Sequence, residues 1–256
     1  MEAFSNLQKL EGIDIESVEC ICVCSQNPDY QLPNTAAIIH HRLGADSGCA
    51  FFDLPLGCSG YVYGLKMVQA FMENAGYKRG LFFTSDPVRK VVDRNDKGTD
   101  LLFGDVATVT LLSDDYVYEI GEATYESDTK NYSGLIKRKD EFMFMDGRKI
   151  FNFTMKCVPM MVKCCLEKNG MPDVDLSIFH QPSKYVLESI NRKLEKILPQ
   201  SALPFWDAYD TGNTASSSIP LILSKYMDKE EYKNILLCGF GVGLSAAALM
   251  LKRSDC

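Results

Sequence analysis

The order of apolar segments along the chain predicts an α/β protein with a largely parallel sheet. Short apolar runs alternate with longer segments whose apolar residues recur at helical spacing, as in strand–helix–strand units. The second half of the chain also repeats the segment order of the first. Together these observations predict two similar βαβ halves, residues 1–115 and 116–256, that face each other.

The predicted strands of the first half are short apolar runs, as expected where both faces of a sheet are buried. The predicted helices have apolar residues at intervals of three and four. The polar segment Ser127–Glu141 at the start of the second half is predicted to be a surface loop. The first-half elements are the strand Glu19–Ser25, the helix Thr35–Leu43, the strand Ala50–Leu54, the helix Ser59–Asn74 and the strands Gly80–Thr84 and Thr108–Leu112.

The second half contains one long uncharged run, Ile235–Leu251, which resembles a membrane span in length. Three glycines in its middle favour a strand, a glycine turn and a second strand instead. The other predicted elements of this half are the strands Leu176–Phe179 and Phe205–Tyr209 and the helices Lys184–Lys196 and Thr214–Met227.

The internal repeat has a constant offset. Ser25 and His180 end matching strands and Cys58 and Asn213 lie in matching turns, and both pairs are 155 residues apart (25 to 180, and 58 to 213). Residue 1 therefore corresponds to residue 156, and the first half lacks counterparts of Tyr116–Met155. We expect from this gap that the chain is a fragment, a split-gene product or one subunit of a complex.

Composition narrows the class of protein. The chain has 256 residues, 46% of them hydrophobic and 24% charged, which is enough to build a sizeable core. A net charge of −7 argues against a nucleic-acid-binding protein. The N-terminus does not have the pattern of a signal peptide, so the ten cysteines are expected to be reduced and the protein cytoplasmic. No metal site is expected, because Cys20, Cys22 and Cys24 alternate along one strand and share one face.

Cys58 is the first candidate for chemistry. It lies in a predicted strand-to-helix turn between Gly57 and Gly60, and the positive end of a helix dipole stabilises a thiolate. The glycines leave room for the backbone turn and for a substrate. The alternative is an ordinary buried cysteine.

His180 and Asn213 are the second and third candidates. His180 ends a predicted strand at the edge of the sheet where α/β proteins bind ligands, and its alternative is a hydrogen-bonded structural histidine. Asn213 is placed by the repeat at the position equivalent to Cys58, and its alternative is a helix cap. Two helix N-termini that meet at one pocket would form a site.

Six motifs, spread in order along the whole chain, carry a resemblance to a known family. The sequence is similar to the β-ketoacyl-[acyl-carrier-protein] synthase III family of the thiolase superfamily. The motifs are Gly57-Cys58-Ser59-Gly60-Tyr61, Phe103-Gly104-Asp105, Met145-Asp146-Gly147-Arg148, His180-Gln181-Pro182, Gly212-Asn213-Thr214 with Ser218-Ile219-Pro220, and Gly239-Phe240-Gly241.

The resemblance implies a thiolase-like fold in α/β/α/β/α layers, a homodimer and a catalytic set of Cys58, His180 and Asn213. It implies no cofactor, only two substrates, a coenzyme A thioester and malonyl-acyl carrier protein. The primer would acylate Cys58, and the malonyl thioester would lose CO2 and condense with the acyl group. The backbone of Cys58 and of the turn Gly241-Val242-Gly243 would hold the oxyanion; the family usually has consecutive glycines there, so Val242 is a departure.

The resemblance also suggests where the substrates bind. Leu32, before Pro33, occupies the position of the residue that reaches across the dimer to cap the acyl pocket, where the family often has an aromatic residue. Arg192 and Lys193 match positions that dock the acidic carrier protein, and Lys184 lies one place before Tyr185, which replaces the family's arginine. A solvated helix face is the alternative reading of these basic residues.

Three functions remain open from the sequence. The first is decarboxylative condensation, the second is acyl transfer without decarboxylation, and the third is a non-catalytic partner subunit of a condensing-enzyme complex. The presence of Cys58, His180 and Asn213 favours an active enzyme, whereas the missing front segment favours the partner subunit.

Overall fold

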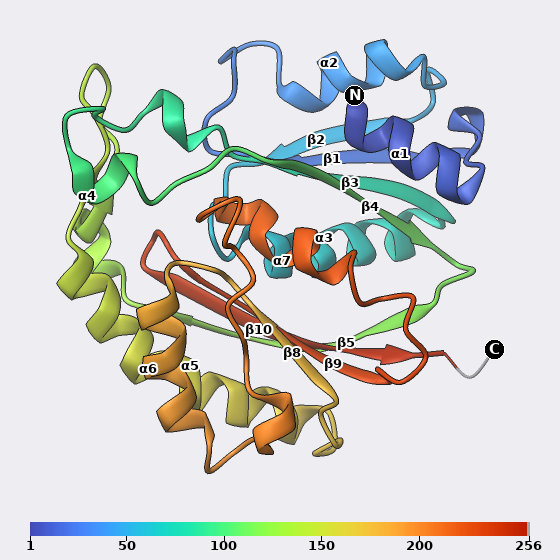
Figure 1. Cartoon of the computed structure of the whole chain (residues 1–256). Coiled ribbons are helices and arrows are strands. Elements are labelled where there is room, and N and C mark those ends of the chain that lie inside the picture. Colours follow the sequence, from blue (N-terminus) through green and yellow to red (C-terminus); the bar gives the residue numbers. More distant parts are fainter. Residues whose placement is uncertain (255–256) are drawn as a thin grey trace.

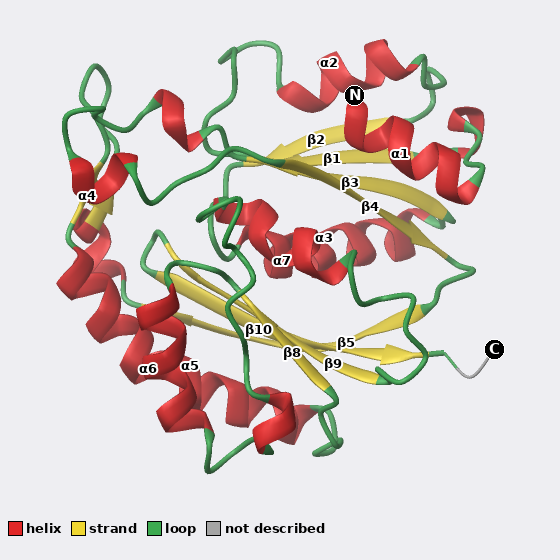
Figure 2. Cartoon of the chain, viewed as in Figure 1, coloured by secondary structure: helices red, strands yellow, loops and turns green. Residues whose placement is uncertain are grey.

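The computed structural model describes residues 1–254 and has five alternating layers of helix and sheet (Figure 1). Two outer layers of helices enclose two sheets, and a central layer of helices lies between the sheets (Figure 2). This is the predicted α/β/α/β/α arrangement. One sheet takes its strands from residues 20–113 and the other from residues 118–253.

The first sheet has the order β2-β1-β3-β4. Its strands β1, β2 and β3 are parallel, and β4 runs antiparallel to β3. All five residues of β1 are buried, as the uninterrupted apolar run predicts. The bounds are Cys20–Cys24 for β1, Ala50–Leu54 for β2, Arg79–Ser85 for β3 and Ala107–Ser113 for β4.

The second sheet has the order β5-β10-β9-β8. Strands β8 and β9 are parallel, whereas β10 is antiparallel to both of its neighbours, β9 and β5. The run Ile235–Leu251 forms most of β9 and β10, so the prediction of two strands joined by a glycine turn is confirmed. The bounds are Tyr118–Ser127 for β5, Leu176–Phe179 for β8, Asn234–Gly241 for β9 and Ser245–Arg253 for β10.

The two sheets differ at both edges. Strand β2 borders β1 in the first sheet, whereas β8 is itself an edge strand of the second sheet. The other edge differs as the internal repeat predicts. In the second sheet, β5 pairs with the outer edge of β10. Within residues 1–254, the corresponding strand of the first sheet, β4, pairs with β3 alone. Strand β5 lies inside the segment Tyr116–Met155 whose counterpart the first half lacks.

The helices are divided among three layers (Figure 1). Helices α1 and α2 cover the outer face of the first sheet, α3 and α7 lie between the sheets, and α5 and α6 cover the outer face of the second sheet. Within residues 1–254, no helix is both long and apolar enough to cross a membrane. The bounds are Glu2–Glu11 for α1, Thr35–Leu43 for α2, Gly60–Ala75 for α3, Lys97–Asp100 for α4, Gly147–Lys168 for α5, Lys184–Leu194 for α6 and Ser218–Leu223 for α7; a small hairpin joins β6 (Leu135–Ile136) to β7 (Phe144–Met145).

The central helices hold the two sheets together through buried apolar side chains. Tyr61 of α3 is 1% exposed and stacks on Phe82 of β3 at 5.7 Å between ring centroids. From α7, Ile219 and Ile222 are buried in the same cluster as Leu237 of β9. Each buried side chain of this size contributes about 1.5–3 kcal/mol, so this layer fixes how the two halves face each other.

Two predicted elements of the second half are wrong. The segment Phe205–Tyr209 is irregular rather than a strand. The side chain of Gln181 donates to the carbonyl of Phe205 at 3.2 Å and accepts from the N–H of Asp207 at 2.9 Å, so it takes the place of a neighbouring strand. The predicted helix Thr214–Met227 is a 3-10 turn, Ala215–Ser217, followed by the short α7.

Candidate active site

Cys58 precedes the first turn of α3 and lies in a dry environment. Its side chain is 8% exposed and belongs to an apolar cluster with Val88, Val92, Phe103 and Ala215. Ser59 is the N-cap residue of α3, so the thiol lies at the positive end of this 16-residue helix. The predicted placement of Cys58 at a helix N-terminus is confirmed.

The electrostatics of Cys58 differ from the expectation for a helix terminus. Burial raises the pKa of the Cys58 thiol to about 12. The backbone N–H of Val242 acts in the opposite direction, whereas the carboxylate of Asp86 raises the pKa further. The expectation that the helix end favours the thiolate is therefore incomplete, because desolvation of the enclosed sulfur opposes it.

The glycine turn after β9 closes over Cys58. A Cβ on Gly241 would lie 2.8 Å from the Cβ and 2.9 Å from the Sγ of Cys58. Gly241 and Gly243 have positive φ angles of 156° and 130°. Val242 lies between them and does not itself have a positive φ angle, so a residue with a Cβ fits there. The valine departs from the family pattern, but its N–H still contacts the Cys58 thiol.

Asn213 is held by backbone and side-chain hydrogen bonds. Its N–H donates to the carbonyl of Leu102 at 2.9 Å, and its carbonyl accepts from the N–H of Gly104 at 3.0 Å. The side-chain Oδ1 accepts from the N–H of Ala215 at 2.9 Å. This contact orients the side-chain amide so that Nδ2 is free to donate a hydrogen bond to another group. Asn213 is buried, with 4% of its surface exposed.

His180 follows the last residue of β8 and is buried, with 1% of its surface exposed. Burial lowers the pKa of His180 to about 3, so the imidazole is neutral at physiological pH. Its Nδ1 lies 2.8 Å from the Oγ of Ser218, and its ring packs edge-on against Phe240 at 5.6 Å between centroids.

Ala215 connects the three predicted residues. It belongs to the apolar cluster of Cys58, its N–H donates to Asn213, and its carbonyl accepts from Ser218, which contacts His180. Its φ angle of 48° is in the left-handed region, which costs a residue with a Cβ about 1–2 kcal/mol. The strained turn at Ala215 explains why the predicted helix does not begin at Thr214.

Asp86 is a further buried residue at this site that the sequence pattern did not identify. It is 1% exposed, and its carboxylate accepts from the N–H of Gln26 and from the Oγ of Ser216, both at 2.7 Å. It thereby joins the turn after β1 to the turn after Asn213. One sequence signal could have identified Asp86: it is an acidic residue directly after a buried strand, in Phe83-Thr84-Ser85-Asp86.

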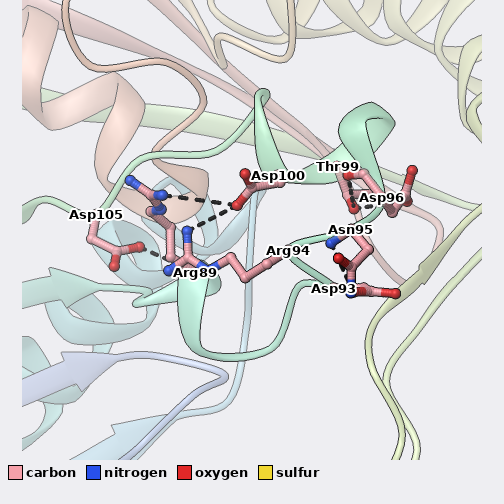
Figure 3. Close-up of polar contacts among 8 residues, drawn as sticks. All are labelled: Arg89, Asp93, Arg94, Asn95, Asp96, Thr99, Asp100 and Asp105. Carbon is pink, nitrogen blue, oxygen red and sulfur yellow. Dashed lines mark hydrogen bonds and ion pairs between the residues drawn. The ribbon is translucent and has the colours of Figure 1, made fainter.

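A polar network holds the segment that supplies Val88, Val92 and Phe103 to the cluster of Cys58 (Figure 3). Arg94 and Arg89 both point toward Asp100, at 2.8 Å and 3.8 Å. The backbone N–H of Arg89 donates to Asp105 at 3.2 Å. These contacts join residues 89–105 to one another and contribute little stability where they are exposed. The burial of Val88, Val92 and Phe103 is what holds the segment against the site.

The predicted binding residues are exposed on the surface, whereas Cys58 is buried. Leu32 is 87% exposed and is the most exposed large apolar side chain of the described residues. Arg192 and Lys193 lie in the last turn of α6 and line a groove of about 550 Å³ between α5 and α6. Lys184 lies at the start of α6 next to Glu188, at 4.0 Å. The groove is completed by Met155, Lys156, Pro159, Met160 and Lys196, which the sequence analysis did not identify.

The layered fold and the buried cysteine, histidine and asparagine define a thiolase-like protein. Two family models match the chain: 3-oxoacyl-[acyl-carrier-protein] synthase III over residues 52–129, and the C-terminal region of the same synthase over residues 166–253. The chain is 32% identical to a β-ketoacyl-[acyl-carrier-protein] synthase III of Halalkalibacterium halodurans, over 98% of this chain and 81% of the relative. A synthase III of Streptococcus thermophilus is 31% identical over 98% of this chain and 82% of its own length. The chain belongs to the β-ketoacyl-[acyl-carrier-protein] synthase III family, whose members are acyltransferases.

Solved structures support the same fold. A 3-oxoacyl-(acyl-carrier-protein) synthase III superposes with a TM-score of 0.90 at 28% identity, covering 98% of this chain and 83% of that one. The synthase from Burkholderia xenovorans gives a TM-score of 0.88 at 29% identity, covering 99% and 78%. The priming β-ketosynthase of the R1128 polyketide pathway gives 0.85 at 25% identity, covering 97% and 80%.

Proposed function

We propose that the chain catalyses decarboxylative Claisen condensation of an acyl-CoA primer with malonyl-acyl carrier protein, through an acyl-Cys58 intermediate. The observation that carries this proposal is the arrangement around the thiol. Cys58 lies at the N-terminus of α3 beneath the N–H of Val242, in one apolar cluster with Ala215, which binds Asn213.

The first half-reaction transfers the acyl group from coenzyme A to Cys58. The sulfur attacks the thioester carbonyl, the carbon–sulfur bond to coenzyme A breaks, and the proton of the Cys58 thiol ends on the coenzyme A thiol. The buried thiol is protonated at neutral pH because its pKa is about 12. The helix terminus and the Val242 N–H stabilise the negative charge that develops on sulfur during the attack.

The second half-reaction forms the new carbon–carbon bond. The malonyl carboxylate leaves as CO2, the resulting enolate attacks the acyl carbon, and Cys58 departs as a thiolate that regains a proton. His180 and Asn213 donate hydrogen bonds to the thioester oxygen on which the enolate charge develops. Preorganised donors of this kind are each worth about 3 kcal/mol in the barrier.

The tetrahedral oxyanion on the acyl carbon needs separate donors. We assign them to the backbone N–H groups of Cys58 and of the turn Gly241-Val242-Gly243. The close approach of Gly241 to Cys58, 2.9 Å from a hypothetical Cβ to Sγ, places this turn directly against the reacting sulfur. Backbone donors fixed by a turn need little reorganisation when the charge forms.

The acyl carrier protein docks at the groove between α5 and α6. Basic side chains line this groove together with the exposed Met160 and the half-buried Met155, which suits an acidic partner with an apolar contact. The basic residues are Arg192, Lys193, Lys156 and Lys196. Lys184 extends the basic surface toward the start of α6. Reversing the charge of Arg192 and Lys193 should raise the KM for the carrier several-fold in low salt, whereas reversing the exposed Lys163 of α5 should not.

Leu32 is assigned to the acyl pocket of a second copy of the chain in a homodimer. Its exposure of 87% fits a side chain that awaits a partner. A leucine is smaller and more adaptable than an aromatic residue, so primers longer than acetyl are expected. Leu32→Phe should then shift the preference toward short primers.

The function is tested by malonyl-dependent CO2 release after the chain is acylated. We expect one CO2 for each β-ketoacyl product. Acylation with no CO2 release would indicate acyl transfer without decarboxylation. Neither acylation nor CO2 release, from a folded chain supplied with a panel of acyl-CoA primers, would indicate a non-catalytic partner subunit.

A further inference from the structure

Two serines join the two segments that border the Cys58 thiol. Ser59 follows Cys58 directly, and Ser245 is the first residue of β10, just after the glycine turn. Their hydroxyl oxygens lie 2.9 Å apart, although the two residues are 186 positions apart in the sequence. Ser59 is 1% exposed and Ser245 is half-buried, so the contact is largely shielded from solvent.

The directions of the two hydroxyl protons follow from their partners. The Oγ of Ser245 lies 2.9 Å from the carbonyl oxygen of Val242, which can only accept a hydrogen bond. Because a hydroxyl has one proton, Ser245 donates to Val242 and accepts from Ser59. The two hydroxyls therefore form one hydrogen-bonded chain, from Ser59 through Ser245 to the carbonyl of Val242.

Ser59 does not use its side chain as a serine at its position usually does. It is the N-cap residue of α3, where a serine hydroxyl typically accepts from a backbone N–H of the first turn. Within residues 1–254, the Ser59 side chain makes no such capping contact. Its contact with Ser245 joins two distant segments instead, which indicates a role between the segments rather than in the helix.

The hydroxyl chain ends on the residue that contacts the thiol. The N–H of Val242 contacts the sulfur of Cys58, and the carbonyl of the same residue is held by Ser245. Strand β9, which leads into this turn, is packed just as closely, since a Cβ on Gly239 would lie 2.8 Å from the carbonyl oxygen of Cys58 and from the Cα of Ser59. Because the carbonyl and the N–H belong to one residue, holding the first restricts the movement of the second.

We propose that Ser59 and Ser245 are positioning residues whose hydroxyl chain holds the turn Gly241-Val242-Gly243 against Cys58. The inference rests on the proposed function for its catalytic consequence, because this turn and the N–H of Cys58 are the donors assigned to the tetrahedral oxyanion. In this role neither hydroxyl binds the substrate or gives up its proton. The hydroxyl chain keeps the donors of the two segments at the spacing that one oxyanion needs.

Four substitutions separate this role from the loss of any buried hydroxyl. Ser245→Ala removes both hydrogen bonds of the chain, whereas Ser59→Ala removes one and leaves the bond to Val242. Ser245→Thr keeps the hydroxyl and adds a methyl group in a strand, where β-branched residues are favourable. The matched control is Ser189→Ala, because Ser189 is also buried but donates to the carbonyl of Tyr185 within α6, at 2.8 Å.

Hydrogen exchange of the full chain at pH 7.5, followed by peptide mass spectrometry, reads the turn without any substrate. We expect the amides of residues 241–245 to exchange about tenfold faster in Ser245→Ala than in the parent, and less than tenfold faster in Ser59→Ala. Ser245→Thr and Ser189→Ala should exchange at the parent rate. Parent-like exchange in Ser245→Ala would overturn the inference; should that variant not fold, parent-like exchange in Ser59→Ala would overturn it.

The catalytic consequence is measured as two rates at Cys58 in a Cys164→Ser background. Acylation by an acyl-CoA passes through a tetrahedral oxyanion, whereas alkylation by iodoacetamide displaces iodide at a saturated carbon and forms none. A displaced Val242 N–H slows both reactions, because it stabilises the thiolate less, but only acylation also loses an oxyanion donor. We therefore expect the ratio of acylation to alkylation to fall by about tenfold in Ser245→Ala and by less in Ser59→Ala.

The double variant Ser59→Ala, Ser245→Ala should acylate no more slowly than Ser245→Ala, because both residues act through one hydroxyl chain. Ser245→Thr should restore the parent ratio. An equal fall of acylation and alkylation, or additive losses in the double variant, would overturn the positioning role. The expected exchange rates in a parent that iodoacetamide alkylates but no acyl-CoA acylates would instead contradict the proposed function and leave the hydroxyl chain standing.

Discussion

The turns that carry Cys58 and Asn213 occupy equivalent places in the two halves, 155 residues apart in the sequence, yet they have different local structures. The turn of Cys58 leads directly into α3, a helix of 16 residues that begins two residues after the cysteine. The turn of Asn213 leads into a 3-10 turn and a helix of only six residues, α7. The first turn places a cysteine thiol at the N-terminus of a long helix, whereas the second uses its strained backbone to hold two side chains.

We infer from this difference that the two turns serve different half-reactions of the proposed mechanism. The Cys58 turn depends on backbone N–H groups and on close packing by Gly241. The Asn213 turn depends on a network in which Ala215 binds Asn213 and Ser218 binds His180. Damage to the first turn should therefore stop acylation, and damage to the second should stop condensation.

The largest expected effect comes from filling the space above Cys58. In Gly241→Ala the new Cβ would lie 2.8–2.9 Å from the Cβ and Sγ of Cys58. We expect acylation to fall by more than a hundredfold, because the methyl group occupies the place of the incoming acyl carbon. The check is the rate of acyl-enzyme formation, followed by mass spectrometry.

Gly147→Ala is the control for this change, since nothing lies within 4 Å of a Cβ at Gly147 in the first turn of α5. It should acylate at the parent rate. Acylation of folded Gly241→Ala at the parent rate would show that this turn does not border the reacting sulfur.

The next largest effect is expected from substitutions of His180 and Asn213, which distinguish the role of the Asn213 turn from that of the Cys58 turn. His180→Ala and Asn213→Ala should each slow condensation by about a hundredfold to a thousandfold, because each removes a donor to the enolate oxygen. Both variants should still form acyl-Cys58. Parallel measurements of CO2 release and acyl-enzyme formation test the separation, and loss of acylation in both would mean that they serve Cys58 itself.

A smaller effect concerns Asp86, which accepts a hydrogen bond from Ser216 after the Asn213 turn and acts on Cys58 through its charge. Its carboxylate raises the pKa of Cys58, although burial is the larger cause. Asp86→Asn should therefore lower the thiol pKa and increase the thiolate fraction at any pH below it. The alkylation rate of Cys58 by iodoacetamide should then rise by a few-fold to about tenfold between pH 7 and 10.

This measurement needs a Cys164→Ser background, because Cys164 is the exposed cysteine of the described residues. Asp105→Asn is the matched control, since Asp105 accepts from the N–H of Arg89 and is not among the causes of the Cys58 shift. Equal alkylation rates in the two variants would contradict the assigned charge effect.

Most of the fold could be predicted because the central strands β1, β8 and β9 are apolar and buried on both faces, and because the helices are amphipathic. Helix α2 and strand β2 have the predicted bounds, Thr35–Leu43 and Ala50–Leu54. The segment Phe205–Tyr209 could not be predicted in the same way, because its partner is the side chain of Gln181 rather than a strand. A local sequence pattern does not show that a side chain distant in the sequence forms the backbone hydrogen bonds of a segment.

The sequence predicts the candidate residues but not their contacts. The repeat and the motifs point to Cys58, His180 and Asn213, whose catalytic roles stay predictions, and the structure connects all three through Ala215. The positive φ of Ala215 and the buried carboxylate of Asp86 depend on tertiary packing, which sequence spacing does not contain. The raised thiol pKa likewise comes from burial in the folded state.

The central claim is that Cys58 accepts the primer. Its most direct test is to incubate the full chain, in the Cys164→Ser background, with a panel of acyl-CoA primers and to locate the added mass by peptide mass spectrometry. We expect one acyl group on the peptide that contains Cys58 and no stable acylation of Cys58→Ala. An acyl group on another residue, or product formation by Cys58→Ala at the parent rate, would contradict it.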